Sequence, residues 1–223
     1  MNASLNQLKE YFRCPETPGS YFLSLEGIEG SGKTSQIKLI EEYFQKKGFR
    51  VLTLREPGGT TFGEKLREAI LQSATPLHPI AECHLFMASR AQLLKEKILP
   101  FLLQPGSIVI VDRYIDSTLA YQGVARGLGL EVVLNLHKDE PLNLIPHRTY
   151  FLDINLQTSL KRQEIRGQVK DYFETEKHEF HQKLIEGYHL AVTTFPERIL
   201  KINAAKSLAE VFDEIKFDLD KRF

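Results

Sequence analysis

The chain has no net charge, few cysteines and no long apolar stretch, and each absence argues against a class of protein. Its 223 residues hold 29 lysines and arginines against 29 aspartates and glutamates, so no global basic field would attract nucleic acid. The two cysteines, Cys14 and Cys83, lack zinc-site spacing, and we expect free thiols in a reducing compartment. No apolar run approaches the roughly 18 residues of a membrane span, and residues 1–20 lack a signal-like apolar core. We therefore expect a cytoplasmic protein without nucleic-acid or membrane partners.

The organisation along the chain favours one domain preceded by a short extension. Residues 1–20 are polar and end in two prolines and a glycine, and we interpret them as a loosely ordered N-terminal extension with a short helix over Leu5–Phe12. Residues 21–223 show no internal repeat and no linker. A domain of this size buries roughly 70–75% of its unfolded surface, which is enough for a core without disulfides or metals.

Short apolar segments alternate with longer helical ones from Tyr21 onward, which predicts an α/β fold. We expect three layers, with helices on both faces of a central five-stranded parallel sheet. The expected strands are Tyr21–Glu26, Val51–Arg55, Ser107–Asp112, Thr149–Asp153 and Ile199–Asn203. The expected helices are Lys33–Lys47, Thr61–Ser73, His78–Leu103, Ser117–Gly123, Leu130–Leu136, Leu156–Arg166, Glu174–Phe195 and Leu208–Lys221.

A phosphate-binding loop directly follows the first expected strand. Its eight residues are Gly27, Ile28, Glu29, Gly30, Ser31, Gly32, Lys33 and Thr34. In this pattern the glycines let backbone N–H groups converge on a polyphosphate, the lysine reaches its outer oxygens, and the threonine hydroxyl ligates Mg²⁺. The expected helix at Lys33 would add the positive end of its dipole. The loop predicts a site for a nucleoside triphosphate with Mg²⁺.

Charged residues follow the second and third expected strands, where ligands of such sheets bind. Asp112 ends an apolar segment, as a carboxylate that holds Mg²⁺ does, although a strand-ending aspartate can also cap a helix. Arg113 and Arg55 occupy similar positions, and an arginine fork suits a phosphate. Two arginines beside a phosphate loop indicate a second, phosphorylated substrate.

Two helical pairs carry weaker signals. Phe86 and Arg90 share a helix face and could stack on a base and bond its edge, but such a pair taken alone is more often core packing plus a surface charge. Arg162 and Arg166 share another face, as in a lid that closes over a triphosphate or in a plain solvated surface.

The run Asp112-Arg-Tyr-Ile-Asp-Ser-Thr-Leu-Ala-Tyr-Gln-Gly123, with Arg126-Gly127 after it, resembles the signature of thymidylate kinases. The loop at Gly27–Thr34, the run Arg55-Glu-Pro-Gly-Gly-Thr60 and the helix from Leu85 to Arg90 resemble the family's other motifs, in order, over residues 21 to about 215. The resemblance implies a P-loop kinase fold. It implies a homodimer that transfers the γ-phosphoryl group of ATP to dTMP with Mg²⁺, giving dTDP for dTTP synthesis.

The resemblance also implies a role for each matching residue. On the donor side, Lys33 and Thr34 would hold the ATP phosphates and Mg²⁺, with Asp112 as the second magnesium position. On the acceptor side, Glu29 would reach the sugar 3′-hydroxyl, and Arg55 and Arg113 would clamp the dTMP phosphate. Phe86 would stack on thymine, Arg90 would bond a base carbonyl, Thr118 and Tyr121 would surround base and sugar, and Pro57 matches a proline often preceded by a cis bond.

The lid, around residues 161–174, departs from the family pattern. Because the phosphate loop carries Glu29 where some members place an arginine, we expect a lid-arginine enzyme, with Lys33, Arg113, Arg162 and Arg166 as catalytic cations and Arg166 preferred within the lid. One residue is extra between Arg166 and Glu174, and Tyr172 stands where an arginine is usual. Lys170 could supply that charge, and Asp171 and Glu174 could orient the lid or cap the next helix.

Two rival functions are compatible with part of this pattern. A nucleotide kinase with a different acceptor would share the fold, although the Ala120–Gly123 run and the Phe86/Arg90 pair argue against it. A GTPase or regulatory ATPase would need no second phosphate clamp, and the chain lacks the Asn-Lys-x-Asp motif of GTPases.

Overall fold

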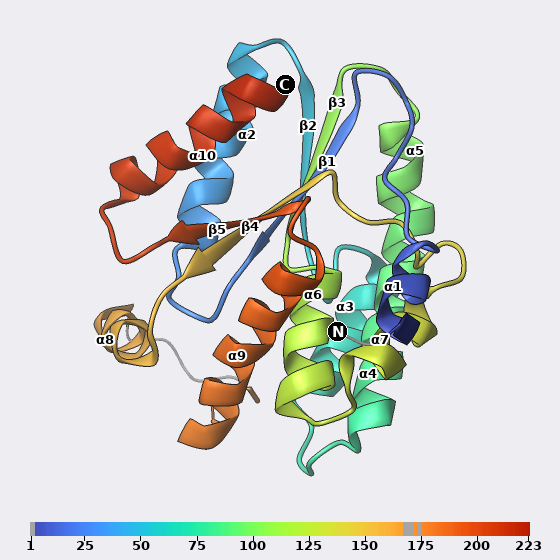
Figure 1. Cartoon of the computed structure of the whole chain (residues 1–223), viewed down its shortest axis with the longest axis vertical. Helices are drawn as coiled ribbons and strands as arrows, with labels where there is room; N and C mark the ends of the chain where they lie inside the picture. Colours follow the sequence, from blue (N-terminus) through green and yellow to red (C-terminus); the bar gives the residue numbers. More distant parts are fainter. Residues whose placement is uncertain (1–2, 167–171, 174) are drawn as a thin grey trace.

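A five-stranded parallel sheet organises the chain (Figure 1). The computed structural model describes residues 3–166, 172–173 and 175–223. The strand order is β2-β3-β1-β4-β5, as expected for a three-layer α/β fold. The strands are β1 (Tyr21–Glu26), β2 (Arg50–Arg55), β3 (Ser107–Asp112), β4 (Arg148–Asp153) and β5 (Ile199–Asn203).

Helices cover both faces of the sheet (Figure 1). Helices α2 (Lys33–Lys46) and α10 (Leu208–Arg222) pack together on one face. The opposite side carries α1 (Ala3–Lys9), α3 (Thr61–Leu71), α4 (Pro79–Leu93), η1 (Leu94–Ile98), α5 (Leu99–Leu102), α6 (Ile115–Thr118), η2 (Leu119–Ala125), α7 (Leu130–His137) and α9 (His178–Thr194). Helix α8 (Leu156–Arg166) lies below β4 and β5 in this view.

The strands are apolar on both faces because both faces are covered. Ile108 and Ile110 of β3 are fully buried in one hydrophobic cluster with residues of α2, while Val109 and Val111 are fully buried in a second cluster with residues of η1. The register places Arg55 level with Asp112, and Asp112 level with Leu25. The polar residues that end three strands therefore meet at one edge of the sheet.

The helix expected over His78–Leu103 is not one regular helix. It is α-helical to Leu93, π-helical from Leu94 to Ile98 and α-helical again from Leu99. Pro100 has no N–H to donate to the carbonyl four residues earlier, which disrupts the regular ladder here. The expected helix Ser117–Gly123 likewise begins earlier, at Ile115, and continues as the π-helix η2. Helix α9 starts at His178, later than expected, and residue 174 lies outside the described residues.

The interpretation of residues 1–20 as loosely ordered is wrong for the described part of this segment. Helix α1 packs against α7, and Arg13 forms a parallel bridge with Leu144. The carbonyl of Gly19 accepts a hydrogen bond from the backbone of Gly106 at 3.1 Å. Side chains dock the segment as well, since Leu5, Leu8 and Phe12 pack against the main hydrophobic cluster.

Helix α9 approaches η2 closely because Gly187 has no side chain. A Cβ atom at this position would stand 2.7 Å from Cα of Ala120, closer than any real packing contact. The neighbouring Tyr188 is thereby held under the loop that follows β3, where its hydroxyl contacts Arg113.

The two thiols, Cys14 and Cys83, are free, as predicted. Among the helices that the structure describes, none combines the length and apolar character needed to cross a bilayer.

Candidate active site

A cavity of about 600 Å³ lies beyond the carboxyl ends of β1, β2 and β3. Most of the residues predicted from the sequence line it, namely Ile28, Glu29, Gly30, Gly32, Lys33, Thr34, Arg55, Pro57, Phe86, Arg90, Asp112, Arg113, Thr118, Tyr121 and Arg162. Gly27 and Ser31 are not among the lining residues, and the side chain of Arg166 lies outside the described residues. The fold thus brings together residues spread over 135 positions, from 28 to 162.

The phosphate loop has a backbone that only glycine permits at its first position. Gly27 has φ 143°, and a Cβ atom there would lie 2.7 Å from the carbonyl oxygen of Leu152 in the adjacent strand β4. Gly32 caps α2 in the left-handed conformation, with φ 95°. The N-terminus of α2 therefore opens directly onto the cavity, where its unpaired N–H groups and dipole favour an anion.

Lys33 points back along the loop. Its Nζ donates to the carbonyl oxygens of Gly27 at 3.0 Å and Ile28 at 3.3 Å. Burial, with a further contribution from the nearby Arg113, lowers the pKa of Lys33 to about 8. A polyphosphate in the cavity would replace these carbonyls with charged oxygens and restore the full charge of the ammonium group.

Asp112 and Arg113 stand at the end of β3. The Oδ1 atom of Asp112 is buried and has no hydrogen-bond partner among the described residues, so it can serve as a metal ligand. Thr34 lines the same cavity. No cluster of three or more acidic, histidine or cysteine side chains occurs within the described ranges. A Mg²⁺ ion here would therefore take most of its ligands from nucleotide phosphates and water, as Mg²⁺ commonly does.

Arg113 lines the cavity between the phosphate loop and the elements that follow β3. It adopts φ 69°, which directs its side chain back toward the phosphate loop. One terminal nitrogen donates to the carbonyl oxygen of Gly27 and to the hydroxyl oxygen of Tyr188, both at 2.8 Å. Its other terminal nitrogen is 4.0 Å from a carboxylate oxygen of Glu29. The guanidinium group is thus held in place before any ligand arrives.

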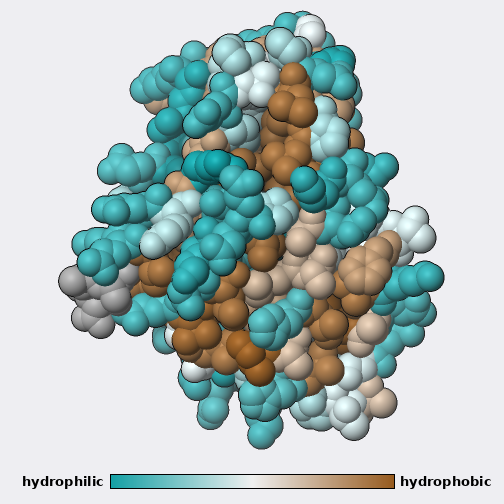
Figure 2. All heavy atoms as spheres, turned by 90° about the vertical axis from the view of Figure 1, so that its right-hand side faces the viewer, coloured by the Kyte–Doolittle hydropathy of each residue, from teal (hydrophilic) through white to brown (hydrophobic). Residues whose placement is uncertain are grey.

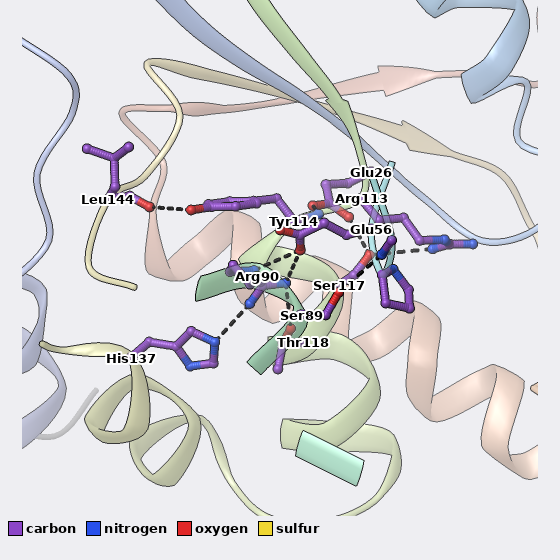
Figure 3. Close-up of polar contacts among 12 residues, drawn as sticks. Glu26, Glu56, Ser89, Arg90, Arg113, Tyr114, Ser117, Thr118, His137 and Leu144 are labelled. Carbon is purple, nitrogen blue, oxygen red and sulfur yellow. Dashed lines mark hydrogen bonds and ion pairs between the residues drawn. The ribbon is translucent and has the colours of Figure 1, made fainter. Parts of the chain in front are cut away.

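A buried polar chain supports Arg113 from below, and the sequence did not reveal it. Glu26 accepts hydrogen bonds from the backbone N–H of Tyr114 at 2.7 Å and the hydroxyl of Ser117 at 2.6 Å. The Ser117 hydroxyl also contacts the Tyr188 hydroxyl at 2.8 Å. Burial, reinforced by the carboxylate of Asp116, raises the pKa of Glu26 to about 8. Figure 3 shows Glu26, Ser117 and Arg113 grouped at the carboxyl end of the sheet.

A second buried network surrounds Arg90, whose side chain is only 1% exposed (Figure 3). Two of its nitrogens donate to one oxygen of Glu56, at 2.5 and 2.7 Å, and one also donates to Thr118 at 3.1 Å. The remaining nitrogen contacts His137 at 2.8 Å. Burial raises the pKa of Glu56, and the ion pair with Arg90 opposes this rise. The sequence indicated Arg90 but neither of its partners Glu56 and His137.

Arg55 differs from Arg90 in being exposed. It pairs with Glu64 at 3.0 Å, and both side chains are about half exposed. Glu64 also accepts from the backbone N–H of Gly59 at 2.8 Å, and this bond lowers the pKa of its carboxyl. The Glu56–Pro57 peptide bond is cis, in agreement with the resemblance.

The described part of the lid is tied to both sides of the cavity. Arg162 donates to the carbonyl oxygens of Gly30 at 3.1 Å and Ala204 at 2.9 Å, which clips α8 to the phosphate loop. On the other side, the ring of Tyr172 lies 5.5 Å from the guanidinium of Arg126. Lys170, Asp171 and Glu174 lie outside the described residues.

Arg126 is a residue whose role the sequence did not reveal, although it belongs to the recognised signature. It pairs with the fully buried Glu82 of α4 at 3.3 Å and with Glu176 at 2.5 Å. Phe180 also packs on its guanidinium, at 4.7 Å. Arg126 therefore joins the base side of the cavity to the segment that ends the lid.

Comparison with known proteins gives one consistent result. Residues 25–215 match the family model described as thymidylate kinase. The chain is 47% identical over 190 residues to a thymidylate kinase of Caldanaerobacter subterraneus subsp. tengcongensis, covering 85% of this chain and 90% of that protein. It is 43% identical over 203 residues to a thymidylate kinase of Thermoanaerobacter sp. (strain X514), covering 91% and 98%. The crystal structure of a thymidylate kinase from Ehrlichia chaffeensis superimposes with a TM-score of 0.69 at 29% identity, covering 91% of this chain and 99% of that one.

Proposed function

This chain belongs to the thymidylate kinase family and transfers the γ-phosphoryl group of ATP to dTMP, and we propose here which of its residues carry that transfer. The observation that supports the assignment best is one continuous cavity lined both by the phosphate loop and by Arg90 and Phe86. Phosphoryl transfer between two nucleotides needs the donor and acceptor phosphates in line, and the cavity places the phosphate loop and the Phe86/Arg90 pair around one space.

On the donor side, the loop N–H groups and Lys33 bind the β- and γ-phosphates of ATP. Thr34 and Asp112 hold Mg²⁺, and the unpartnered buried oxygen of Asp112 supports this assignment. The bound ion would neutralise phosphate charge. The ammonium of Lys33 moves from the carbonyls of Gly27 and Ile28 to the phosphate oxygens.

On the acceptor side, Arg113 and Arg55 bind the dTMP phosphate, and Glu29 receives the sugar 3′-hydroxyl. Phe86 stacks on the base, Arg90 donates to a base carbonyl, and Thr118, Tyr121 and Pro57 enclose base and sugar. The acceptor phosphate is already ionised near pH 7, so positioning and charge neutralisation supply the catalysis without a strong general base.

Lys33, Arg113 and a lid arginine stabilise the negative charge on the transferred phosphoryl group. Arg162 already donates to two backbone carbonyls, which favours a holding role and leaves Arg166 as the transition-state cation. Replacing Arg166 with Ala should lower kcat far more than nucleotide affinity. The exposed Lys161→Ala on the same helix is the matched control. An unchanged kcat in the Arg166 variant would remove that residue from the mechanism.

The protein acts as a homodimer in the cytoplasm, without nucleic-acid or membrane partners. Figure 2 shows apolar side chains gathered in a band on the face that carries α4 and α5. Leu103, which follows α5, is 73% exposed, and Phe62 of the adjacent α3 is 48% exposed. Apolar area of this kind marks interaction surfaces. Light scattering on the eluting protein should give twice the monomer mass, and a monomer mass would refute the dimer.

Acceptor choice is tested by coupled ATP turnover against dTMP, dUMP, dCMP and dAMP. We expect strict dependence on an acceptor, with dTMP the best. Preference for another monophosphate would favour the rival kinase, and phosphate release without an acceptor would favour a hydrolase or switch.

A further inference from the structure

His137 stands directly behind Arg90 and takes no part in lining the cavity. It is the last residue of α7 and its side chain is fully buried. Its Nε2 atom is 2.8 Å from Nη1 of Arg90, and its Nδ1 atom is 2.8 Å from the carbonyl oxygen of Val133. Figure 3 shows the imidazole ring on the side of Arg90 away from Glu56.

The two partners of His137 fix its protonation and tautomer. Arginine can only donate, so Nε2 must accept from Arg90, and a carbonyl can only accept, so Nδ1 must carry the proton. Burial and the neighbouring positive charge lower the pKa of His137 to about 3. The end of a helix normally favours a positively charged histidine, but a proton on Nε2 would point at a guanidinium N–H. The ring is therefore a neutral acceptor throughout the physiological pH range.

The hydrogen bonds of Arg90 then leave a single donor unassigned. A guanidinium group has five N–H bonds. Four hydrogen bonds to protein are formed, two to Glu56, one to Thr118 and one to His137. The fifth hydrogen is on Nη1, the same nitrogen that bonds His137, and it has no acceptor among the described residues. Because Glu56 and Thr118 hold the other two nitrogens, His137 decides which Nη1 hydrogen remains for a ligand.

We propose that His137 is a positioning residue that sets base specificity by fixing Arg90 with one directed Nη1 hydrogen toward the acceptor base. This inference rests on the proposed contact between Arg90 and the base. Thymine presents a carbonyl oxygen at ring position 4, which can accept that hydrogen. Cytosine presents an amino group there, which can only donate and would leave both donors unpaired in a dry site.

The test compares two variants that differ in their acceptor. His137→Leu removes the acceptor and fills the space with an apolar side chain, and His137→Gln can place its amide oxygen near the position of Nε2. In the Leu variant we expect KM for dTMP to rise roughly tenfold, the size of one lost charge-assisted bond. KM for ATP should change less than twofold, kcat should fall less than KM for dTMP rises, and the preference for dTMP over dCMP should narrow. In the Gln variant, KM for dTMP and the preference for dTMP over dCMP should both return most of the way to the wild-type values.

A residue that merely fills the core would behave differently. It would lower the melting temperature in both variants and move the constants for ATP and dTMP together, and that result would overturn the proposal. An unchanged KM for dTMP in the Leu variant would also overturn it. If Arg90→Lys leaves KM for dTMP unchanged, the proposed base contact itself fails. If the wild-type protein does not phosphorylate dTMP, the proposed function itself is wrong.

A measurement on the unmodified protein covers the case in which the Leu variant does not fold. ¹⁵N NMR of the imidazole rings should show one histidine with a protonated Nδ1 and an acceptor Nε2. Its signals should not titrate between pH 5 and pH 9, and its Nε2 shift should move when dTMP is added but not when ATP is added. The proposal would be contradicted if every histidine titrated in that range. It would also be contradicted if the Nε2 chemical shift did not change when dTMP is added.

Discussion

The two halves of the cavity are built in opposite ways. The donor half is eight consecutive residues whose backbone and one lysine face the ligand. The acceptor half is assembled from side chains on separate elements, such as Arg90 of α4, Thr118 of α6 and His137 of α7. The donor half is therefore weakened mainly by losing a group that contacts the ligand. The acceptor half is weakened by leaving its buried partners unpaired, whether or not they touch the ligand.

The largest effect should come from the donor half. Lys33→Met removes the cation nearest the phosphates, and we expect kcat to fall about 10³-fold, with little change in melting temperature because the buried charge is costly. Lys38→Met, an exposed lysine on the same helix, is the control. Steady-state kinetics measures the change in kcat, and thermal unfolding measures the change in melting temperature. A variant that keeps its rate would show that the loop backbone alone supports the transfer.

In the acceptor half, a similar substitution should damage the fold as well as binding. Arg90→Met leaves Glu56 buried and unpaired, and we expect unfolding to become easier by about 3 kcal/mol, with KM for dTMP raised at least roughly tenfold. Lys206→Met breaks an exposed pair with Glu214 and should cost less than about 0.5 kcal/mol. Denaturant titration measures both. Equal costs in the two variants would contradict the contrast between buried and exposed pairs.

A pH series sharpens the donor side further. Burial holds the pKa of Lys33 near 8 in the folded protein, against 10.5 without burial. Between these values the unfolded chain binds a proton that the folded chain does not, so the contribution of Lys33 makes unfolding harder as pH rises from 8 to 10.5.

ATP favours the charged lysine, so its binding should require proton uptake above pH 8. We expect affinity for a non-hydrolysable ATP analogue to fall roughly tenfold between pH 7 and pH 9. Calorimetry in buffers of different ionisation enthalpy detects the proton. The Lys33→Met variant should lack this slope, and a slope that persists there would assign the effect to another group.

The smallest effect should come from the exposed part of the acceptor half. Glu64→Gln removes the partner of Arg55, and exposed pairs contribute at most about 1 kcal/mol. We expect less than a threefold change in KM for dTMP and almost none in the melting temperature. A change as large as that of Arg90→Met would mean that exposure does not separate the two arginines.

The sequence predicted the sheet and the donor half well for a physical reason. Strands buried on both faces are continuous apolar runs, and the conformation of the phosphate loop is determined by consecutive residues. Three of the five strands have the expected bounds, and the other two begin one residue earlier. The expected helix Leu156–Arg166 also has its observed bounds.

What the sequence could not predict is pairing between distant residues. Glu56 and Arg90 are 34 positions apart, and Arg90 and His137 are 47 apart. No periodicity relates such positions, because the tertiary fold alone brings them together. The packing of residues 1–20 was missed for a similar reason, since Leu5, Leu8 and Phe12 are few apolar side chains in a polar segment and their partners are distant in sequence. A buried glutamate at the end of an apolar strand, Glu26, was the one available clue to the network under Arg113.

Gly187 shows how selection can act on a residue that has no chemistry of its own. Any mutation of its codon that changes the amino acid adds a Cβ atom within 2.7 Å of Cα of Ala120. Because that clash is with backbone, no compensating side-chain change in the neighbouring helix can relieve it. A residue that contacts the ligand can be replaced through intermediates that each retain some activity. A substitution of Gly187 is tolerated only if α9 and η2 move apart. Residue 187 should therefore remain glycine even where the residues around the substrate diverge.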